Sequence, residues 1–338
     1  MKKMNSRYMI YMIIGLILAA LPLLGQMGIL GGWIISTVGF VIIYAIAALG
    51  LNVLLGYSGL VSLGTAGFMG VAAYLTMHFT VTVGLSFWFA LPIIIIILTL
   101  LGLLVGLVSL RLAGMSLAIA TLAVSEVLRR IIIDTWGFMP HHLQRPDIFV
   151  RFLERDGTFW LIVIFLVVLM ILTDNFIHSP IGRAFLTMRI SEPAAQAMGI
   201  NLLKYKLMAF GIATAYASLA GILYAHLLTS VGPEPWTVML SLQIVAIIVI
   251  GGFKTITGAI VGSFIVFGVP RLVLNQLPDL FGVNPVTTFL SSAGVPLILN
   301  GLLIIAVILF YPRGLIYVGH DLKRLYKRLS KKKEVKSS

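Results

Sequence analysis

The sequence predicts an all-α polytopic membrane protein of about ten transmembrane helices, with both termini in the cytoplasm and one short cytoplasmic helix. Of its 338 residues, 60% are hydrophobic and only 10% are charged, whereas a soluble domain carries about 25% charged residues. No Asp, Glu, Lys or Arg occurs between Tyr8 and Leu110, and a soluble core could not enclose so long an uncharged stretch. Soluble enzymes and transcription factors are therefore excluded.

Proline, glycine and scattered charges divide the chain into apolar runs of about 20 residues, the length that a transmembrane helix needs. The first run, from Tyr8 to Leu24, is long for a signal peptide and lacks a small-residue cleavage site, so we predict a retained span. The eighth run is short and the ninth follows closely, so we expect one of them to be tilted or broken. The predicted spans are 8–25, 33–55, 60–80, 87–109, 112–133, 158–177, 206–230, 238–252, 256–275 and 294–312.

The basic residues predict the orientation of these spans, because Lys and Arg concentrate on the cytoplasmic side of a membrane. With the N-terminus inside, 18 of the 24 basic residues fall on the inner side. The net charge of +13 therefore indicates membrane lipid, not nucleic acid, as the partner of the basic surface. The inner set is Lys2, Lys3, Arg7, Arg111, Arg183, Arg189, Lys204, Lys206, Lys254 and the nine from Arg313 to Lys336; the outer set is Arg129, Arg130, Arg145, Arg151, Arg155 and Arg271.

Two connections inside the predicted transmembrane domain, residues 1–316, are longer than a turn. Residues 134–157 form an outer, extracytoplasmic loop, and residues 178–206 form an inner connection that holds four Lys and Arg residues. Residues 317–338 form a basic cytoplasmic tail. We expect soluble partners to dock at the two long connections.

Motifs for several kinds of catalysis are missing from the sequence. There is no G-x-x-x-x-G-K loop to hold the phosphates of ATP, and there is no H-E-x-x-H or G-x-S-x-G motif. The chain has no cysteine, and its six histidines are not spaced as metal ligands with a carboxylate. We therefore expect no catalytic residue, metal site or cofactor in this chain.

One acidic residue, Glu126, lies well inside a predicted span, with Arg129 and Arg130 at i+3 and i+4. We predict an ion pair within the helix that neutralises Glu126 near the outer interface. The alternative is a polar lining for a translocation path. A proton- or sodium-coupled carrier usually has ionisable groups near the bilayer midplane, and Asp174, at the inner end of its span, is predicted to be interfacial instead.

Glycine and small hydroxyl residues are concentrated between residues 56 and 74. Small residues three or four apart let helices approach closely in lipid. Alternatively, the segment is a broken or re-entrant element whose backbone lines a pore, and the sequence favours neither interpretation. A similar pattern occurs from Gly251 to Gly262, and shared small-residue packing explains the likeness. The candidate residues are Gly56, Ser58, Gly59, Ser62, Gly64, Thr65 and Gly67.

The inner connection contains the signals of a short helix. Ser191 is a suitable N-cap, Glu192 follows it in the first turn, and Gly199 is a suitable stop. The alanines between them form a small-residue face that suits insertion into a partner's groove. An ordinary amphipathic loop, made basic by its place inside the cell, is the alternative. The candidate contact residues are Ser191, Glu192, Ala194, Ala195, Ala197 and Gly199.

These residues resemble a known family. Glu192, Ala194, Ala195 and Gly199 fit the E-x-A-A-x-x-x-G coupling-helix motif of ABC importer permeases, and the surrounding sequence is similar to branched-chain amino-acid permeases of the LivM type. The resemblance covers roughly residues 45–316. The family often has His or Gln where Thr65 stands, and an acidic residue where Ser191 stands. Further matching stretches are LGLNVLLGYSGLVSLGTAGF from Leu49, ATLAVSEVLRR from Ala120, AGILYAHLL from Ala220, IVIGGFKTITGAIVG from Ile248 and LFYPRGL from Leu309.

The resemblance implies a translocating subunit of a bacterial or archaeal cytoplasmic membrane. It implies four partners: a second, homologous permease, two cytoplasmic ATPase subunits that bind the ATP, and an extracytoplasmic substrate-binding protein. Leucine, isoleucine and valine are the expected substrates, while urea or short amides are carried by close relatives. A secondary carrier for a neutral solute and, less favoured, a passive channel are the alternatives from other classes.

Overall fold

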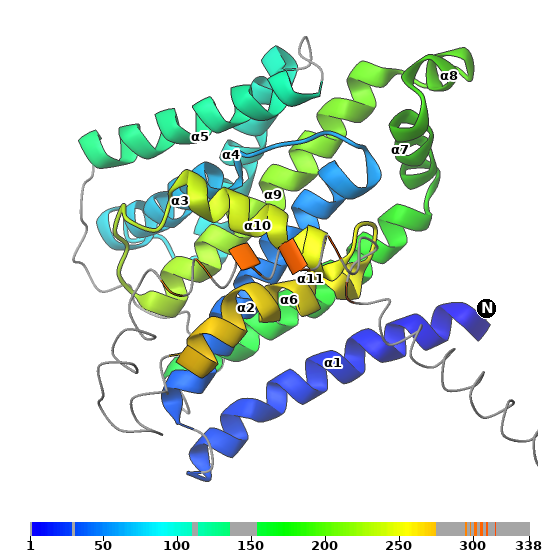
Figure 1. The fold of residues 1–338 in the computed structure, drawn as a ribbon. Helices are drawn as coiled ribbons and strands as arrows, with labels where there is room; N and C mark the ends of the chain where they lie inside the picture. The colour runs from blue at the N-terminus through cyan, green and yellow to red at the C-terminus, as the bar shows by residue number, and fades with distance from the viewer. Residues whose placement is uncertain are drawn as a thin grey trace, which may run out of the picture.

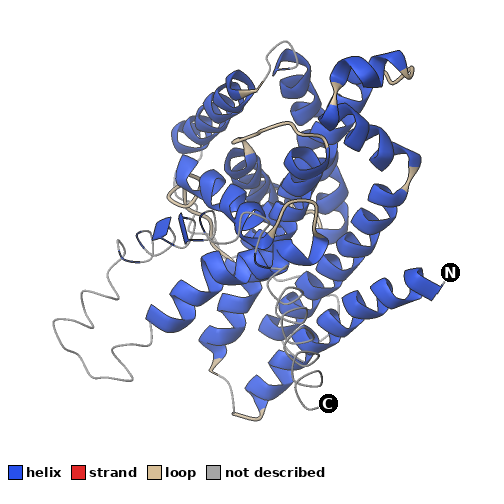
Figure 2. Cartoon of the chain, turned by 45° about the vertical axis from the view of Figure 1, so that its right-hand side comes forward, coloured by secondary structure: helices blue, strands red, loops and turns tan. Residues whose placement is uncertain are grey.

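The computed structural model describes residues 2–28, 31–109, 114–135 and 154–274, with single positions and pairs between 295 and 315. These residues form an all-helical bundle without strands (Figures 1 and 2). Its elements are α1 (Lys2–Gln26), α2 (Gly32–Leu51), η1 (Asn52–Tyr57), α3 (Thr65–Met77), η2 (His78–Thr82), α4 (Phe87–Ser109), α5 (Met115–Thr135), α6 (Glu154–His178), α7 (Pro180–Ile190), α8 (Glu192–Ala197), α9 (Leu202–Leu228), α10 (Val238–Gly251), α11 (Ile256–Ser263), η3 (Phe264–Gly268) and η4 (Pro270–Leu274), where η denotes a π-helical turn.

Five of the described helices are long and apolar enough to cross a membrane, or six if the bent pair α10 and α11 is one span. They coincide with the first, second, fourth, sixth and seventh predicted spans. The predicted span 60–80 is interrupted, because the helix begins only at Thr65. The loop 134–157, the span 294–312 and the tail 317–338 lie largely or wholly outside the described residues, so about ten spans stays a prediction. The long spans are Arg7–Gln26, Gly32–Tyr57, Phe87–Val108, Gly157–His178 and Leu202–Leu228.

Helices α2 and α9 form the centre of the bundle. Fifteen residues of α2 are buried, and glycines allow the close approach of its neighbours. A Cβ at Gly50 would lie 2.4 Å from the Cβ of Tyr216, and one at Gly221 would lie 2.2 Å from the carbonyl oxygen of Met69. The outer helices α1 and α4 expose large apolar residues such as Leu16 and Phe89, as expected of side chains that face lipid.

Helices α10 and α11 form a bent pair with an angle of 119° between them. A Cβ at Gly251 would lie 1.9 Å from the carbonyl oxygen of Gly258, so only glycine permits this crossing. The turn between the helices is bound to η1: Asn52 Nδ2 donates to the carbonyl of Thr255 at 3.0 Å, and Tyr57 donates to that of Lys254 at 2.5 Å. The two similar glycine-rich segments of the sequence therefore meet in space.

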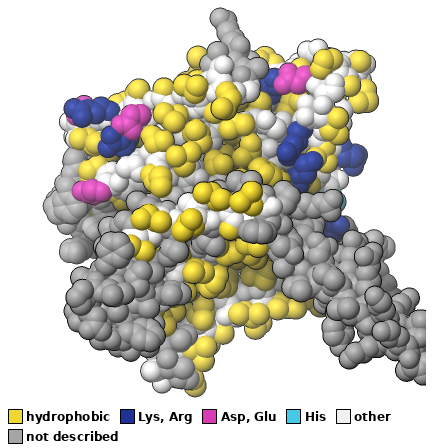
Figure 3. All heavy atoms as spheres, in the orientation of Figure 1, with side chains coloured by type: hydrophobic (Ala, Val, Ile, Leu, Met, Phe, Trp, Pro, Cys, Tyr) yellow, Lys and Arg dark blue, Asp and Glu magenta, His cyan; other side chains and the backbone are white. Residues whose placement is uncertain are grey.

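The charged side chains of the described residues gather towards two ends of the bundle. The start of α1 and the pair α7 and α8 lie at one end, on the right of Figure 1, and the end of α5 lies at the other. On the face in Figure 3, Lys and Arg lie towards these ends and hydrophobic side chains predominate between them. This arrangement agrees with the separation of basic residues used to predict the orientation.

Candidate functional site

The predicted glycine-rich segment is not one continuous helix. Residues 58–64 have irregular backbone between η1 and α3. Gly59 adopts a φ of +79°, which glycine favours, and a Cβ there would meet Cγ of Arg189 at 2.9 Å. The segment is thus both broken and closely packed: Gly64 and Gly67 have Cβ positions 3.3 Å from the Thr121 carbonyl and 2.7 Å from Ser125 Cα. A pore lined by this backbone stays a prediction.

The first amides of α3 have no cap from the preceding residue. Hydroxyl groups of two other helices accept from them instead: Ser241 Oγ of α10 from the amide of Ala66 at 3.0 Å, and Ser125 Oγ of α5 from that of Gly67 at 2.9 Å. In a membrane, water cannot satisfy such groups, so irregular backbone needs protein partners. The start of α3 is therefore held by α5 and α10.

Four hydroxyl side chains surround a small cavity inside the bundle. Ser62 and Thr65 come from the predicted set, and Thr121 and Thr214 are contributed by α5 and α9. Its volume of about 10 Å³ is near the minimum for one water molecule. In this conformation the cavity is too small for any solute larger than water. The apolar lining residues are Leu51, Leu54, Phe68, Val105, Phe210, Ala213 and Ala217.

The predicted ion pair forms between Glu126 and Arg129. Nε of Arg129 donates to both carboxylate oxygens, at 3.0 and 2.9 Å. Arg130 instead pairs with Asp134 at 3.1 Å. The Glu126 side chain is 44% exposed, and neither it nor Arg129 lines the hydroxyl cavity. The geometry supports the local pair, while any role in transport stays a prediction.

The short helix of the inner connection, α8, has the caps that the sequence predicts. Ser191 Oγ accepts from the amide of Ala194 at 3.3 Å, and Gly199 has a φ of +77° beyond the end of the helix. The carboxylate of Glu192 forms an ion pair of 2.7 Å with Lys206 of α9. Helix α8 is thereby fixed to the next long helix.

The small-residue face expected on α8 needs a correction. Ala195 is fully buried against the rest of its own chain and therefore cannot insert into a partner's groove. Ala194 and Ala197 are exposed, and Met198 beside them is 65% exposed. Ala195 faces inward because α8 packs against its own chain, and such packing cannot be read from alanine spacing. Ile190 and Leu203 extend the exposed apolar surface at this end.

Arg189, at the end of α7, was not among the predicted site residues. Its guanidinium lies 5.9 Å from the ring centroid of Phe253, in the turn between α10 and α11, and its side chain abuts Gly59. Nη1 is buried without a hydrogen-bond partner among the described residues, and burial lowers the pKa of the guanidinium. No sequence motif marks this residue; its contacts join segments far apart in the chain.

Several helices that are long and apolar enough to cross a membrane define a multi-pass membrane protein. The family described as "Branched-chain amino acid transport system / permease component" matches residues 33–311, and the chain belongs to this family. Members of the family are transport subunits, not enzymes. They act together with the other subunits of ABC transporters.

The relatives support a LivM-type permease. The chain is 34% identical to the high-affinity branched-chain amino acid transport system permease protein LivM of Escherichia coli, over 62% of this chain and 56% of that protein. It is 33% identical to the Salmonella typhimurium LivM over the same shares. Ribose import permease protein RbsC of Haemophilus influenzae is 28% identical over 58% of this chain and 64% of its own. The chain thus spans little more than half the length of these LivM proteins. No solved structure matches it.

Proposed function

We propose that this chain is the permease subunit of an ABC importer that moves leucine, isoleucine and valine across the cytoplasmic membrane of a bacterium or archaeon. It pairs with a second, homologous permease and receives substrate from an extracytoplasmic binding protein. Two cytoplasmic ATPase subunits bind the ATP and drive transport. The similarity to LivM supports the substrate class, and the family match supports the transport role.

The contacts of Arg189 are the observation that carries the mechanism. Helix α8 follows α7 after the single residue Ser191, so a movement of α8 also displaces Arg189. Arg189 contacts Phe253 in the turn between α10 and α11, and Gly59 in the irregular segment that leads to the hydroxyl cavity. Closure of the ATPase subunits against α8 would therefore shift the α10–α11 turn and the irregular segment beside the hydroxyl cavity between two packings.

An exposed alanine of α8 provides the test. In proteoliposomes that hold the assembled transporter, Ala197→Trp should leave ATP hydrolysis but reduce leucine uptake at least about tenfold, because the indole blocks close docking of α8. The matched control is Thr135→Trp, at an exposed residue that ends α5 at the opposite end of the bundle from α8. This variant should transport normally. Normal uptake by Ala197→Trp would contradict ATPase docking at α8.

A substrate panel separates the alternatives. Uptake of leucine that needs both ATP and the binding protein supports the proposal, while uptake without either indicates a secondary carrier or a channel. The panel includes urea, acetamide and ribose, the last because one relative is a ribose permease. Preference for any of these three over leucine would reassign the substrate.

A further inference from the structure

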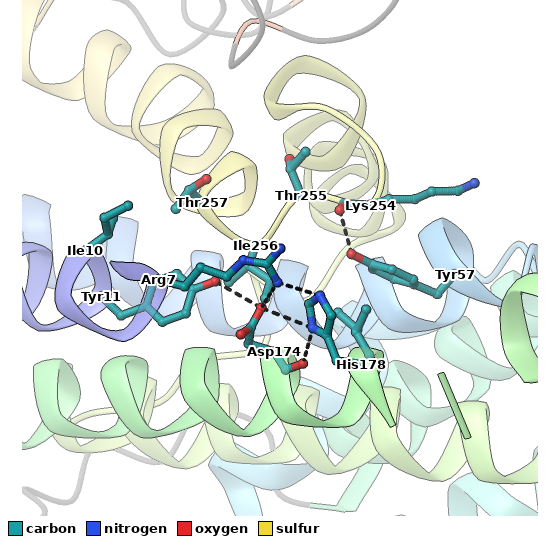
Figure 4. A pocket seen from close by; sticks show the side chains of 11 residues that line it. Arg7, Ile10, Tyr11, Tyr57, Asp174, His178, Lys254, Thr255, Ile256 and Thr257 are labelled. Carbon is teal, nitrogen blue, oxygen red and sulfur yellow. Dashed lines mark hydrogen bonds and ion pairs between the residues drawn. The ribbon is translucent and has the colours of Figure 1, made fainter. Parts of the chain in front are cut away.

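A second cavity, of about 380 Å³, lies between α1, α6, η1 and the turn that joins α10 to α11. Figure 4 shows its side chains converging from these four elements. Its volume is within the range of small-molecule sites. It includes His178, directly before α7, and so lies at the end of the bundle that is cytoplasmic in the proposed orientation.

One cation and one anion from different helices face this cavity. Nη1 of Arg7 lies 3.8 Å from Oδ1 of Asp174, which is longer than a hydrogen bond. Tyr11 donates to the same oxygen at 3.3 Å. Among the described residues no hydrogen bond reaches Oδ2, although the Asp174 side chain is only 7% exposed. Arg7 is 47% exposed, so both groups retain hydrogen-bonding capacity for a ligand.

His178 also faces Asp174, because its Nδ1 lies 3.5 Å from Oδ1 of that carboxylate. Nε2 of His178 accepts from Nη1 of Arg7 at 2.5 Å, and Nδ1 donates to the carbonyl of Asp174 at 2.7 Å. This hydrogen-bond arrangement needs a neutral ring, so His178 adds no charge in it. The Lys254 side chain extends away from the cavity, which its backbone lines (Figure 4). Three isoleucines complete the apolar part of the lining: Ile10, Ile177 and Ile256.

We propose that this cavity binds a free aliphatic amino acid from the cytoplasmic side. The carboxylate of the ligand pairs with Arg7, its ammonium pairs with Asp174, and its side chain packs against the isoleucines. A zwitterion pairs with the half-exposed Arg7 and the buried Asp174 at once, which neither an amine nor a carboxylic acid alone can do. The choice of an amino acid, and the cytoplasmic side, rest on the proposed function.

The position of the cavity gives such a ligand a regulatory effect. His178 is the last residue of α6, and Ser179 caps α7, which leads to α8. A ligand here would hold the α6–α7 joint against the turn between α10 and α11. Accumulated product would then slow further import, because the proposed mechanism moves α7 and this turn during the transport cycle.

Equilibrium binding of tritiated leucine to the full chain, in nanodiscs of phosphatidylcholine and phosphatidylglycerol and without binding protein, tests this site. Arg7→Gln and Asp174→Asn should each weaken binding about tenfold or more, since each removes a charge-assisted contact. Arg130→Gln and Asp134→Asn remove an exposed arginine and an exposed aspartate at the end of α5, away from the cavity, and should bind like the unchanged protein. Isoamylamine and 4-methylpentanoate, each with one of the two charges, should compete poorly.

A third variant guards against misfolding of the buried pair. Thr257→Phe places a ring in the cavity from the wall opposite Asp174 (Figure 4) and leaves the α1–α6 contacts in place; it should also abolish binding. In proteoliposomes, leucine preloaded on the side of the ATPase subunits should inhibit import by the unchanged protein and not by Thr257→Phe. Equal leucine binding by all three pocket variants and the unchanged protein would overturn the proposal.

Phosphatidylethanolamine carries the same pair of charges in its headgroup, so a second arm tests lipid. If this lipid abolishes leucine binding, or copurifies with the unchanged protein but not with Asp174→Asn, the occupant is a lipid and the amino-acid proposal fails. Failure of the proposed function is distinct: the unchanged, assembled transporter would then show no ATP-dependent leucine import, whatever the pocket variants bind.

Discussion

At the scale of single residues, Gly67 offers the most direct test of the packing. A Cβ at this position would lie 2.7 Å from Cα of Ser125, and backbone cannot move away as a flexible side chain can. We expect Gly67→Ala to lower the free energy of unfolding by about 1–3 kcal/mol, seen as a lower melting temperature of the purified protein. Gly157→Ala is the control, because nothing lies within 4 Å of its Cβ position. An unchanged melting temperature for Gly67→Ala would show that α3 and α5 are less closely packed.

Residues with local roles could be predicted from the sequence, whereas residues with distant partners could not. Ser191 and Gly199 act on the helix between them, so their roles as cap and stop follow from the order of residues. The cavity of Arg7 and Asp174 joins positions 167 residues apart with η1 and the turn near Lys254. From the sequence alone, Asp174 is therefore predicted only to be an interfacial residue, and Arg7 contributes only to the predicted orientation.

At the scale of the elements, the contact between α7 and the α10–α11 turn predicts a coupling defect. Arg189→Ala removes the guanidinium from Phe253 and the side chain from Gly59. Movement of α8 would then no longer reach the hydroxyl cavity, so we expect ATP hydrolysis to continue while import falls at least about tenfold. Arg183→Ala, an exposed arginine of the same helix, controls for the loss of charge. A parallel loss of hydrolysis and import would instead indicate failed assembly.

The breaks between elements explain which predicted spans were imprecise. Long apolar runs determine α2, α4 and α9, so their predicted and observed bounds agree within a few residues. The start of α3 depends on hydroxyl groups of α5 and α10, and the bend between α10 and α11 depends on Asn52 and Tyr57. Hydropathy contains no signal for such contacts, although the glycine clusters did mark both places.

At the scale of the whole molecule, the separation of charges predicts which end faces the cytoplasm. The native chain has no cysteine, so single cysteines report topology without further changes. Met198, between α8 and α9, and Thr135, at the end of α5, are both exposed and suit replacement by cysteine, whereas Thr158, near the start of α6, is buried and unsuitable. In intact cells a membrane-impermeant maleimide should label Thr135→Cys only, and Met198→Cys should react only after the membrane is opened. Labelling of Met198→Cys from outside would show that the orientation of the molecule is opposite to the one proposed. Helix α8 would then lie beyond the reach of ATPase subunits, and the coupling role of Arg189 and the cytoplasmic amino-acid site would both fail.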